Sequence, residues 1–303
     1  MDLFDNSIQV SLVIIGNGFD IHHGLATSYA DFRNYLIQNG NASFVEQLES
    51  FFQSEYYDEK EGRHKFLLWS NLEAAIGDYD IDSLYHELTD WIHVDYDHMI
   101  QSATQYEDSP NDFLAPLMDG LPGVVNSWIS KVSLHGVVAD VVLPRDAKYL
   151  SFNFTTVLED VYRIPEDRIL HVHGLIGGTE ELIVGHKVYT DESEAFEVGA
   201  PIFQDEAKRN IIGIMNERRK PTEEIISKHQ PFFKSLQDIT DIYVYGHSYS
   251  MVDRDYYEEI QKNVGPETKW HLGCHDDSAR DAAKSLMHFL HIPKEYWGRF
   301  TIQ

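Results

Sequence analysis

Four short segments of this chain carry glycine or polar residues of the kinds that bind or activate ligands. They are Gly16-Asn17-Gly18-Phe19-Asp20, Ser151-Phe152-Asn153-Phe154-Thr155, His171-Val172-His173-Gly174 and Gly246-His247-Ser248. Each follows an apolar run typical of a buried strand, such as Leu12-Val13-Ile14-Ile15. In open α/β sheets, ligands bind outside the carboxyl ends of the strands. The segments therefore predict one ligand cleft, of a kind that holds a nucleotide.

Two of the segments are glycine turns. Gly16 and Gly18 have the Gly-x-Gly spacing of phosphate-binding loops, in which glycines let backbone N–H groups approach a phosphate. The third glycine of the dinucleotide fingerprint is missing, because Ile21 stands in its place. A tight strand-to-helix turn explains the same spacing. Gly246 lies in a similar position after a later strand, where Ser248 would contact a ribose or a phosphate.

Asn153 and His173 are the candidates for catalysis. The Asn153 amide could orient a ribose hydroxyl or a water, or it could bond its own backbone as a turn residue. His171 and His173 are two residues apart, so on a strand they share one face. A histidine suits general-base work near neutral pH, and a hydrogen-bonded core histidine is the alternative. We expect no metal, because no complete ligand set is visible.

The elements expected around these segments form an α/β fold, with a Rossmann-like open parallel sheet. Predicted strands cover 9–15, 137–143, 148–152, 169–173, 182–184, 242–245 and 270–273. Thr156-Val157-Leu158-Glu159 predicts the capped start of a helix after Asn153. We expect residues 1–40 and 145–303 to form the sheet core. Residues 41–144 read as a mainly helical insertion that follows the first strand and covers the cleft.

Composition narrows the class of protein. The net charge of −26 disfavours bulk nucleic-acid binding, and no stretch is apolar enough for a membrane helix. The single cysteine, Cys274, and the acidic N-terminus favour a cytoplasmic protein without a signal peptide. No Lys or Arg falls between Phe66 and Ser130, which indicates a solvated acidic face or a surface for a basic partner.

The order and spacing of the motifs resemble those of the AbiH family of bacteriophage abortive-infection proteins. Besides the four segments, the resemblance uses Gly24-Leu25-Ala26-Thr27-Ser28-Tyr29-Ala30-Asp31-Phe32 and Trp69-Ser70-Asn71-Leu72-Glu73. AbiH proteins in turn look like distant relatives of the sirtuin-like fold. In that superfamily a glycine-rich loop holds the phosphates of NAD, and an Asn and a His act at the nicotinamide ribose. Asn153 and His173 occupy the matching places.

The resemblance implies an antiphage effector that hydrolyses NAD at the nicotinamide–ribose bond. Asn153 and His173 would be catalytic, Glu73 would belong to a lid, and NAD would be substrate rather than cofactor. The expected substrate contacts are Gly16, Asn17, Gly18, Phe19, Asp20, His171, Gly246, His247, Ser248 and Asp253. One cysteine cannot build the zinc module of sirtuin deacetylases, and Thr155 replaces the acid that ends their Asn-Ile-Asp segment.

Two other functions stay open. The cleft could bind a nucleotide without turnover, as a sensor or a partner-binding module of a defence system, or the protein could be a defence nuclease. The expected partner is NAD or a related nucleotide. A second copy of the chain and a second defence protein are open alternatives, and no membrane partner is expected. The trigger, the exact nucleotide and the role of the acidic insertion do not follow from the sequence.

Overall fold

The computed structural model describes residues 10–52, 55–58, 63–66, 68–93 and 98–301. Within this part the chain forms two compact units. The sheet unit comprises residues 1–27, 129–182 and 221–303, and the helical unit comprises residues 28–128 and 183–220. The expected insertion of residues 41–144 differs from this division. The helical unit begins earlier, at residue 28, and also takes in 183–220, which we had assigned to the sheet core.

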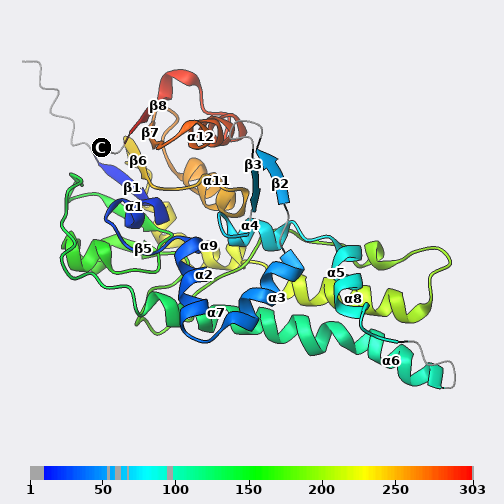
Figure 1. Ribbon diagram of the computed structural model, residues 1–303. Coiled ribbons are helices and arrows are strands. Elements are labelled where there is room, and N and C mark those ends of the chain that lie inside the picture. The colour runs from blue at the N-terminus through cyan, green and yellow to red at the C-terminus, as the bar shows by residue number, and fades with distance from the viewer. Residues whose placement is uncertain (1–9, 53–54, 59–62, 67, 94–97, 302–303) are drawn as a thin grey trace, which may run out of the picture. The chain divides into compact units, whose positions relative to one another are not determined.

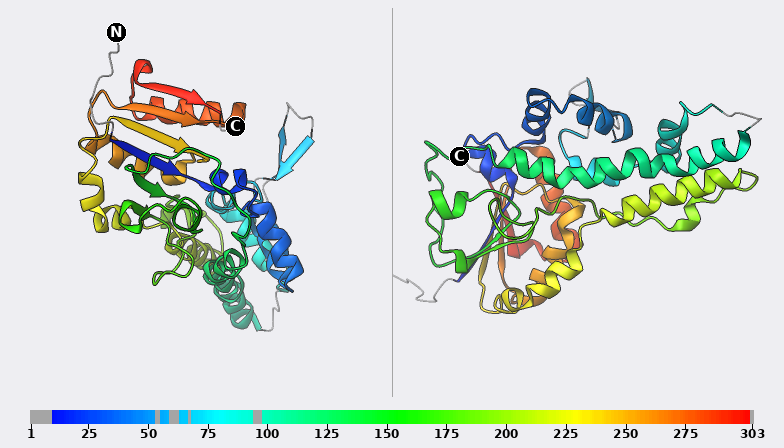
Figure 2. Two further views of the ribbon diagram at one scale, coloured as in Figure 1. Left: turned by 90° about the vertical axis from the view of Figure 1, so that its left-hand side faces the viewer. Right: turned by 90° about the horizontal axis from the view of Figure 1, so that it is seen from below.

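The sheet unit is built on six parallel strands in the order β5-β4-β1-β6-β7-β8 (Figure 1). The strands are β1 (Ser11–Ile15), β4 (Lys148–Ser151), β5 (Ile169–His171), β6 (Asp241–Tyr245), β7 (Lys269–Gly273) and β8 (Trp297–Phe300). They lie side by side in the left view of Figure 2. This order is that of a Rossmann fold, so the strand order reverses between β1 and β6. The expected Rossmann-like parallel sheet is confirmed.

Helices connect the strands of this unit. They are α1 (Asn17–His22), α9 (Thr222–Lys228), α10 (Gln230–Lys234), α11 (Arg254–Asn263) and α12 (Asp277–Phe289). Residues 137–143 and 182–184, which we expected to be strands, form irregular backbone, and β8 was not anticipated. The expected capping box after Asn153 is also wrong. Residues 157–161 form one short π-type turn, and Thr156 makes no side-chain cap.

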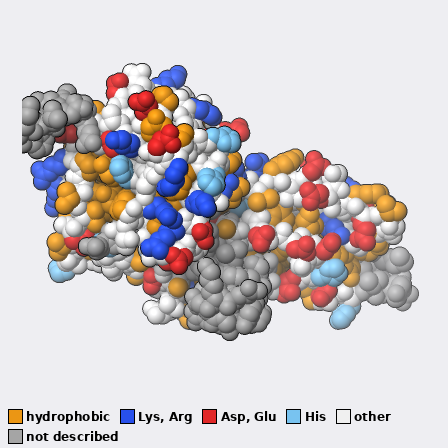
Figure 3. All heavy atoms as spheres, turned by 90° about the horizontal axis from the view of Figure 1, so that it is seen from above, with side chains coloured by type: hydrophobic (Ala, Val, Ile, Leu, Met, Phe, Trp, Pro, Cys, Tyr) orange, Lys and Arg blue, Asp and Glu red, His pale blue; other side chains and the backbone are white. Residues whose placement is uncertain are grey.

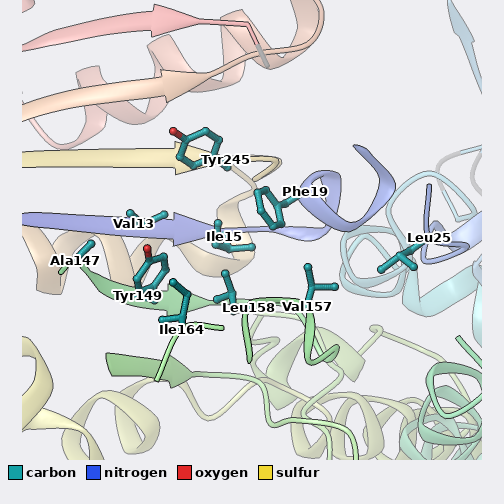
Figure 4. Close-up of a cluster of buried hydrophobic side chains, with 10 residues drawn as sticks. All are labelled: Val13, Ile15, Phe19, Leu25, Ala147, Tyr149, Val157, Leu158, Ile164 and Tyr245. Carbon is teal, nitrogen blue, oxygen red and sulfur yellow. The ribbon is translucent and has the colours of Figure 1, made fainter. Parts of the chain in front are cut away.

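Side chains of the central strands and of α1 form a buried hydrophobic cluster on the sheet (Figure 4). Strand β1 is buried along its whole length, which explains its continuous apolar sequence. Phe19 of α1 is fully buried and packs on Tyr245 at the end of β6, with ring centroids 6.2 Å apart. This packing fixes the turn that follows β1, and with it the positions of the residues that the turn carries.

The helical unit contains a bundle of helices and one β-hairpin. Its helices are α2 (Tyr29–Gln38), α3 (Ala42–Phe52), α4 (Leu72–Gly77), α5 (Ile81–Thr89), α6 (Met99–Ser109), α7 (Ala115–Ile129, whose last residue belongs to the sheet unit) and α8 (Ile202–Glu217). The hairpin pairs β2 (Glu55–Asp58) with β3 (Arg63–Phe66). Ser28 and Asp31 form a capping box at the start of α2.

Helices α6 and α8 of this unit pack together (Figure 2, right). The rings of Tyr106 and Phe203 lie 5.1 Å apart, and Asn210 Nδ2 donates to the Glu107 carbonyl over 2.8 Å. On the face drawn in Figure 3, Asp and Glu side chains are spread over this unit with few Lys or Arg between them. This face of the helical unit is therefore acidic.

Candidate functional site

Two glycine turns meet where the strand order reverses, between β1 and β6. The Gly18 N–H donates to the Gly246 carbonyl over 2.7 Å, and the Gly16 N–H donates to the Tyr245 carbonyl over 2.9 Å. A Cβ atom on Gly246, whose φ is +64°, would lie 2.0 Å from the backbone nitrogen of Phe19. The glycines are therefore required because two backbones touch at this edge of the sheet.

This contact changes the role that we expected for the first turn. The N–H groups of Gly16 and Gly18 bind carbonyls at the end of β6, in place of the phosphate that the spacing suggested. The two turns nevertheless carry exposed polar side chains, namely Asn17 and Ser248. Asn17 is tied down by its Nδ2 atom, which donates to the Thr27 carbonyl over 2.6 Å. The two N–H groups that Gly16 and Gly18 would offer a phosphate are thus occupied, and the other ligand contacts expected from these turns stay predictions.

Asp20 is 1% exposed and joins the first turn to the end of β4. Its Oδ1 atom accepts a hydrogen bond from Asn153 Nδ2 over 2.8 Å, and its Oδ2 atom accepts one from Thr155 Oγ1 over 2.6 Å. Burial raises the pKa of Asp20 from 3.8 to about 6, against the opposing effect of these two hydrogen bonds and of the charge of His171. Both oxygens of Asp20 thus accept hydrogen bonds from side chains of the protein.

The Asn153 side chain reaches across the sheet edge rather than bonding its own backbone. Its Nδ2 atom donates to Asp20 and, over 3.2 Å, to the Gly16 carbonyl. Its Oδ1 atom is buried and has no hydrogen-bond partner among the residues that the structure describes. A buried acceptor left unpaired costs about 1–3 kcal/mol. This oxygen is therefore suited to accept a hydrogen bond from a hydroxyl group or a water.

His171 and His173 are directed at different partners, which corrects the expectation that they share one strand face. Strand β5 ends at His171, so His173 lies in the turn that follows. His171 Nε2 lies 2.8 Å from Glu159 Oε1, and its Nδ1 lies 3.2 Å from the Asn153 carbonyl. Both ring nitrogens of His171 therefore face acceptors. The ring links the end of β4 to the turn at 157–161.

His173 shares a carboxylate with His247. Asp253 Oδ1 lies 3.4 Å from His173 Nε2, and Asp253 Oδ2 lies 3.4 Å from His247 Nε2. His247 Nδ1 accepts the backbone N–H of Tyr249 over 2.9 Å, so in the neutral ring the proton sits on Nε2 and points at Asp253. His173, His247 and Asp253 are 4%, 5% and 7% exposed. The three side chains form a buried imidazole–carboxylate–imidazole group.

Aromatic rings surround this group. The Phe152 ring lies 5.3 Å from that of His173 and 4.5 Å from that of His247, between ring centroids. The rings of Tyr256 and Tyr257 of α11 lie 5.4 Å and 6.4 Å from that of Phe152, and 6.0 Å and 5.3 Å from those of His173 and His247 respectively. Charges interact more strongly in such apolar surroundings than in water. Asp253 is therefore placed to interact with both imidazoles in a largely apolar environment.

Glu73, the expected lid residue, has a partner inside the helical unit. Its Oε2 atom lies 2.8 Å from the Nζ of Lys220, whose side chain is fully buried, and its Oε1 atom accepts the Gly185 N–H over 3.3 Å. These contacts join α4 to the segment 183–220. They give Glu73 a structural role in its own unit, and its role as a lid stays a prediction.

The structure also uses residues that the sequence did not place in the site. Thr155 was singled out only as a departure from the sirtuin pattern, yet its hydroxyl binds Asp20. Glu159 was read as a capping residue, yet it binds His171. Tyr249 fixes the tautomer of His247. All three lie within six residues of a predicted site residue, and that proximity was the signal available to find them.

The geometry can now be set beside known proteins. Residues 12–273 match the family model described as bacteriophage abortive infection AbiH. The chain belongs to the AbiH family. Membership assigns the protein to phage abortive infection, as the motif order indicated. Searches of curated proteins and of solved structures gave no match.

Two further features of this AbiH protein concern metal sites and membrane-spanning helices. Across the described ranges, no group of three or more His, Cys, Asp or Glu side chains is arranged to hold a metal ion. None of the helices described for the chain has the length and apolar character needed to cross a bilayer.

Proposed function

We propose that this AbiH protein hydrolyses NAD at the bond between nicotinamide and ribose. One observation carries the proposal: within the described residues the buried Oδ1 atom of Asn153 has no hydrogen-bond partner, and a buried histidine–carboxylate pair belongs to the same sheet edge. Both neighbours of Asn153 in the chain contact the His173 ring, Phe152 at 5.3 Å and Phe154 at 6.5 Å. An acceptor for a hydroxyl and a base for a proton therefore belong to one stretch of the sheet edge.

The reaction breaks a C–N bond and forms a C–O bond. The electron pair of the broken bond goes to the nitrogen of nicotinamide, which leaves as a neutral base and needs no acid. The ribose carbon then has oxocarbenium character, by analogy with glycoside hydrolysis, and a water adds to it. Asn153 Oδ1 would accept a hydrogen bond from that water or from a ribose hydroxyl, and so fix the reacting atoms in line.

His173 would take the proton that the water releases. Its Nε2 atom faces Asp253, so Nδ1 is the ring nitrogen that is not directed at this carboxylate. Asp253 would stabilise the imidazolium that forms, as a carboxylate does beside a catalytic histidine. His247 would hold the second carboxylate oxygen and keep Asp253 in place.

The experiment is a nicotinamide-release assay on the purified protein and on three variants. Asn153→Ala and His173→Ala are each expected to lower kcat by about 100-fold or more, because each removes a group that acts on the reacting atoms. Asp281→Asn is the control, since Asp281 is an exposed carboxylate on α12 of the same unit. Circular dichroism would confirm that all variants are folded. Turnover by both alanine variants at the wild-type rate would contradict the assignments.

Measuring NAD in infected cells extends the assay to the case in which phage infection supplies a trigger. Cells with the wild-type protein should lose NAD after infection, and cells with either alanine variant should keep it. If the wild-type protein binds NAD without releasing nicotinamide in vitro or in infected cells, the hydrolysis proposal fails. The sensor function, in which a nucleotide binds without turnover, would then take its place.

A further inference from the structure

Asp20 is the residue of the first turn whose acidic character a phosphate loop does not explain. It is buried, no Lys or Arg side chain contacts it in the described structure, and both of its oxygens accept hydrogen bonds from neutral donors. A buried carboxylate held by neutral donors is costly, and burial raises its pKa to about 6. Such a cost calls for a role that a neutral side chain would not fill.

The orientation of the Asn153 amide suggests that role. The two groups that face its nitrogen are Asp20 Oδ1 at 2.8 Å and the Gly16 carbonyl at 3.2 Å, and both are acceptors. A flipped amide would place Asn153 Oδ1 against these two oxygens, and its N–H groups would lose both acceptors. The network therefore assigns the amide one orientation, in which the oxygen is the atom left over.

We propose that Asp20 is a positioning residue that locks the Asn153 amide with its oxygen toward the ligand, so that the site selects a hydroxyl or a water that donates a hydrogen bond. This inference rests on the proposed function, because it names the ligand group that Asn153 would bind in that reaction. Asp20 would itself touch no substrate. An ionised Asp20 enforces the orientation, whereas a protonated Asp20 can donate and so tolerates the flipped amide.

The first test is a double-mutant cycle read by nicotinamide release. We expect Asp20→Asn to lower kcat about tenfold and to change KM by less than about twofold, because a neutral partner enforces the amide orientation only in part. In the Asn153→Ala background, Asp20→Asn should have no further effect on kcat, since its effect passes through that amide. A further tenfold loss in the double variant would overturn the proposal. Asp281→Asn is again the control.

The second test needs no turnover. The side-chain NH₂ resonances of Asn153 are assigned in ¹⁵N-labelled protein by their loss in Asn153→Ala, and are then followed from pH 4.5 to 8. They should shift with a midpoint near the Asp20 pKa of about 6, and Asp20→Asn should remove that shift. The other titratable groups that face Asp20 are His171 and Glu159. Both remain in the variant, so a shift that persists there belongs to them and would overturn the proposal.

The two tests separate the failure of this inference from that of the proposed function. If the resonances titrate as expected but the wild-type protein releases no nicotinamide, NAD hydrolysis fails and the positioning role stands. If nicotinamide is released but the resonances ignore both pH and Asp20→Asn, the positioning role fails and the reaction stands.

Discussion

Two buried carboxylates lie at the same edge of the sheet, and their partners differ in kind. Asp20 is held by an amide and a hydroxyl at 2.8 Å and 2.6 Å, whereas Asp253 faces two imidazoles at 3.4 Å each. An amide and a hydroxyl do not take a positive charge near neutral pH, but an imidazole does. Asp20 is thus suited to fix geometry, and Asp253 is suited to stabilise a proton that comes and goes.

The turns that carry these carboxylate groups are themselves joined by backbone contacts. Asp20 lies two residues after Gly18, and His247, which faces Asp253, follows Gly246 directly. The hydrogen bond from Gly18 to Gly246 therefore connects the Asp20 group with the Asp253 group. Loss of this contact should disturb both groups, whereas a change in one carboxylate should disturb only one.

Asp253→Asn should have the largest effect on activity. We expect kcat for nicotinamide release to fall by about 10³-fold, because the imidazolium of His173 loses its counter-charge and general-base catalysis contributes about 10²–10⁴-fold. Asp241→Asn is a matched control, since Asp241 is also buried and lies 2.8 Å from His271 at the other end of β6. The interpretation of Asp253 would be wrong if both variants lost activity equally.

Gly246→Ala should disturb the contacts of both Asp20 and Asp253. A Cβ atom 2.0 Å from the Phe19 nitrogen, at a φ of +64°, forces the two turns apart. We expect a loss of about 4 kcal/mol in the free energy of unfolding, from backbone strain together with overpacking. Chemical denaturation followed by circular dichroism would measure it.

Gly24→Ala is the control for that substitution. Gly24 also has a positive φ, of +75°, but a Cβ atom there would meet nothing within 4 Å. The free energy of unfolding of Gly24→Ala should therefore fall by only about 1 kcal/mol, because of the φ angle alone. Equal losses in the two variants would show that the φ angle, rather than the contact between the turns, makes Gly246 necessary.

The parallel sheet and most of its strands could be predicted from the sequence, whereas β8 could not. Strand β1 is fully buried, so its apolar run is unambiguous, and Asn153 and His247 each lie two residues after the end of a strand. The partners of these residues could not be predicted. The hydrogen bond between Asp20 and Asn153 joins residues 133 positions apart, and its existence depends on strand order, which local patterns do not encode.

The role of the glycines shows a second limit. A Gly-x-Gly spacing permits close approach by any group, and here the group that approaches Gly16 and Gly18 is the backbone of another turn. The division between the two units could not be predicted from local patterns either, because it also depends on contacts between distant segments. Segment 183–220 lies far along the chain from α4, and the buried pair of Lys220 and Glu73 joins them.

Asp20→Asn should change how stability depends on pH. The pKa of Asp20 is raised in the folded state, from 3.8 to about 6, so its favourable contribution is complete below about pH 4 and is lost as the pH rises through 6. That loss corresponds to about 3 kcal/mol, from about 1.4 kcal/mol for each pKa unit. The variant has no carboxyl group at this position and so lacks this pH-dependent loss of stability. Its free energy of unfolding relative to wild type should therefore increase by about 3 kcal/mol between pH 4 and pH 8.

Urea denaturation at several pH values would measure this difference. Asp281→Asn supplies the control, because an exposed carboxylate should give a nearly constant difference from wild type. If Asp20→Asn also gave a constant difference, Asp20 would not be the buried, neutrally bound carboxylate that the comparison with Asp253 requires.

Thr155→Val should have the smallest effect, and it tests whether neutral donors hold Asp20. The substitution keeps the shape of the side chain and removes the hydroxyl that donates to Asp20 Oδ2 over 2.6 Å. We expect a loss of about 1–2 kcal/mol in the free energy of unfolding at pH 8, where Asp20 is ionised, because a hydrogen bond to a charged group is worth more than a neutral one. The loss should be smaller at pH 4.5, where Asp20 is protonated.

Thr27→Val is the matched control for this substitution. Thr27 is 3% exposed, and its hydroxyl is buried with no hydrogen-bond partner within the described part of the chain. Removing an unpaired hydroxyl should leave stability unchanged or raise it, at both pH values. A loss in Thr155→Val that did not depend on pH would mean that the hydroxyl gains nothing from the charge of Asp20. The Asp20 carboxylate would then depend on the Asn153 amide for its hydrogen bonding, and the coupling between these two residues would be stronger than the two-donor arrangement implies.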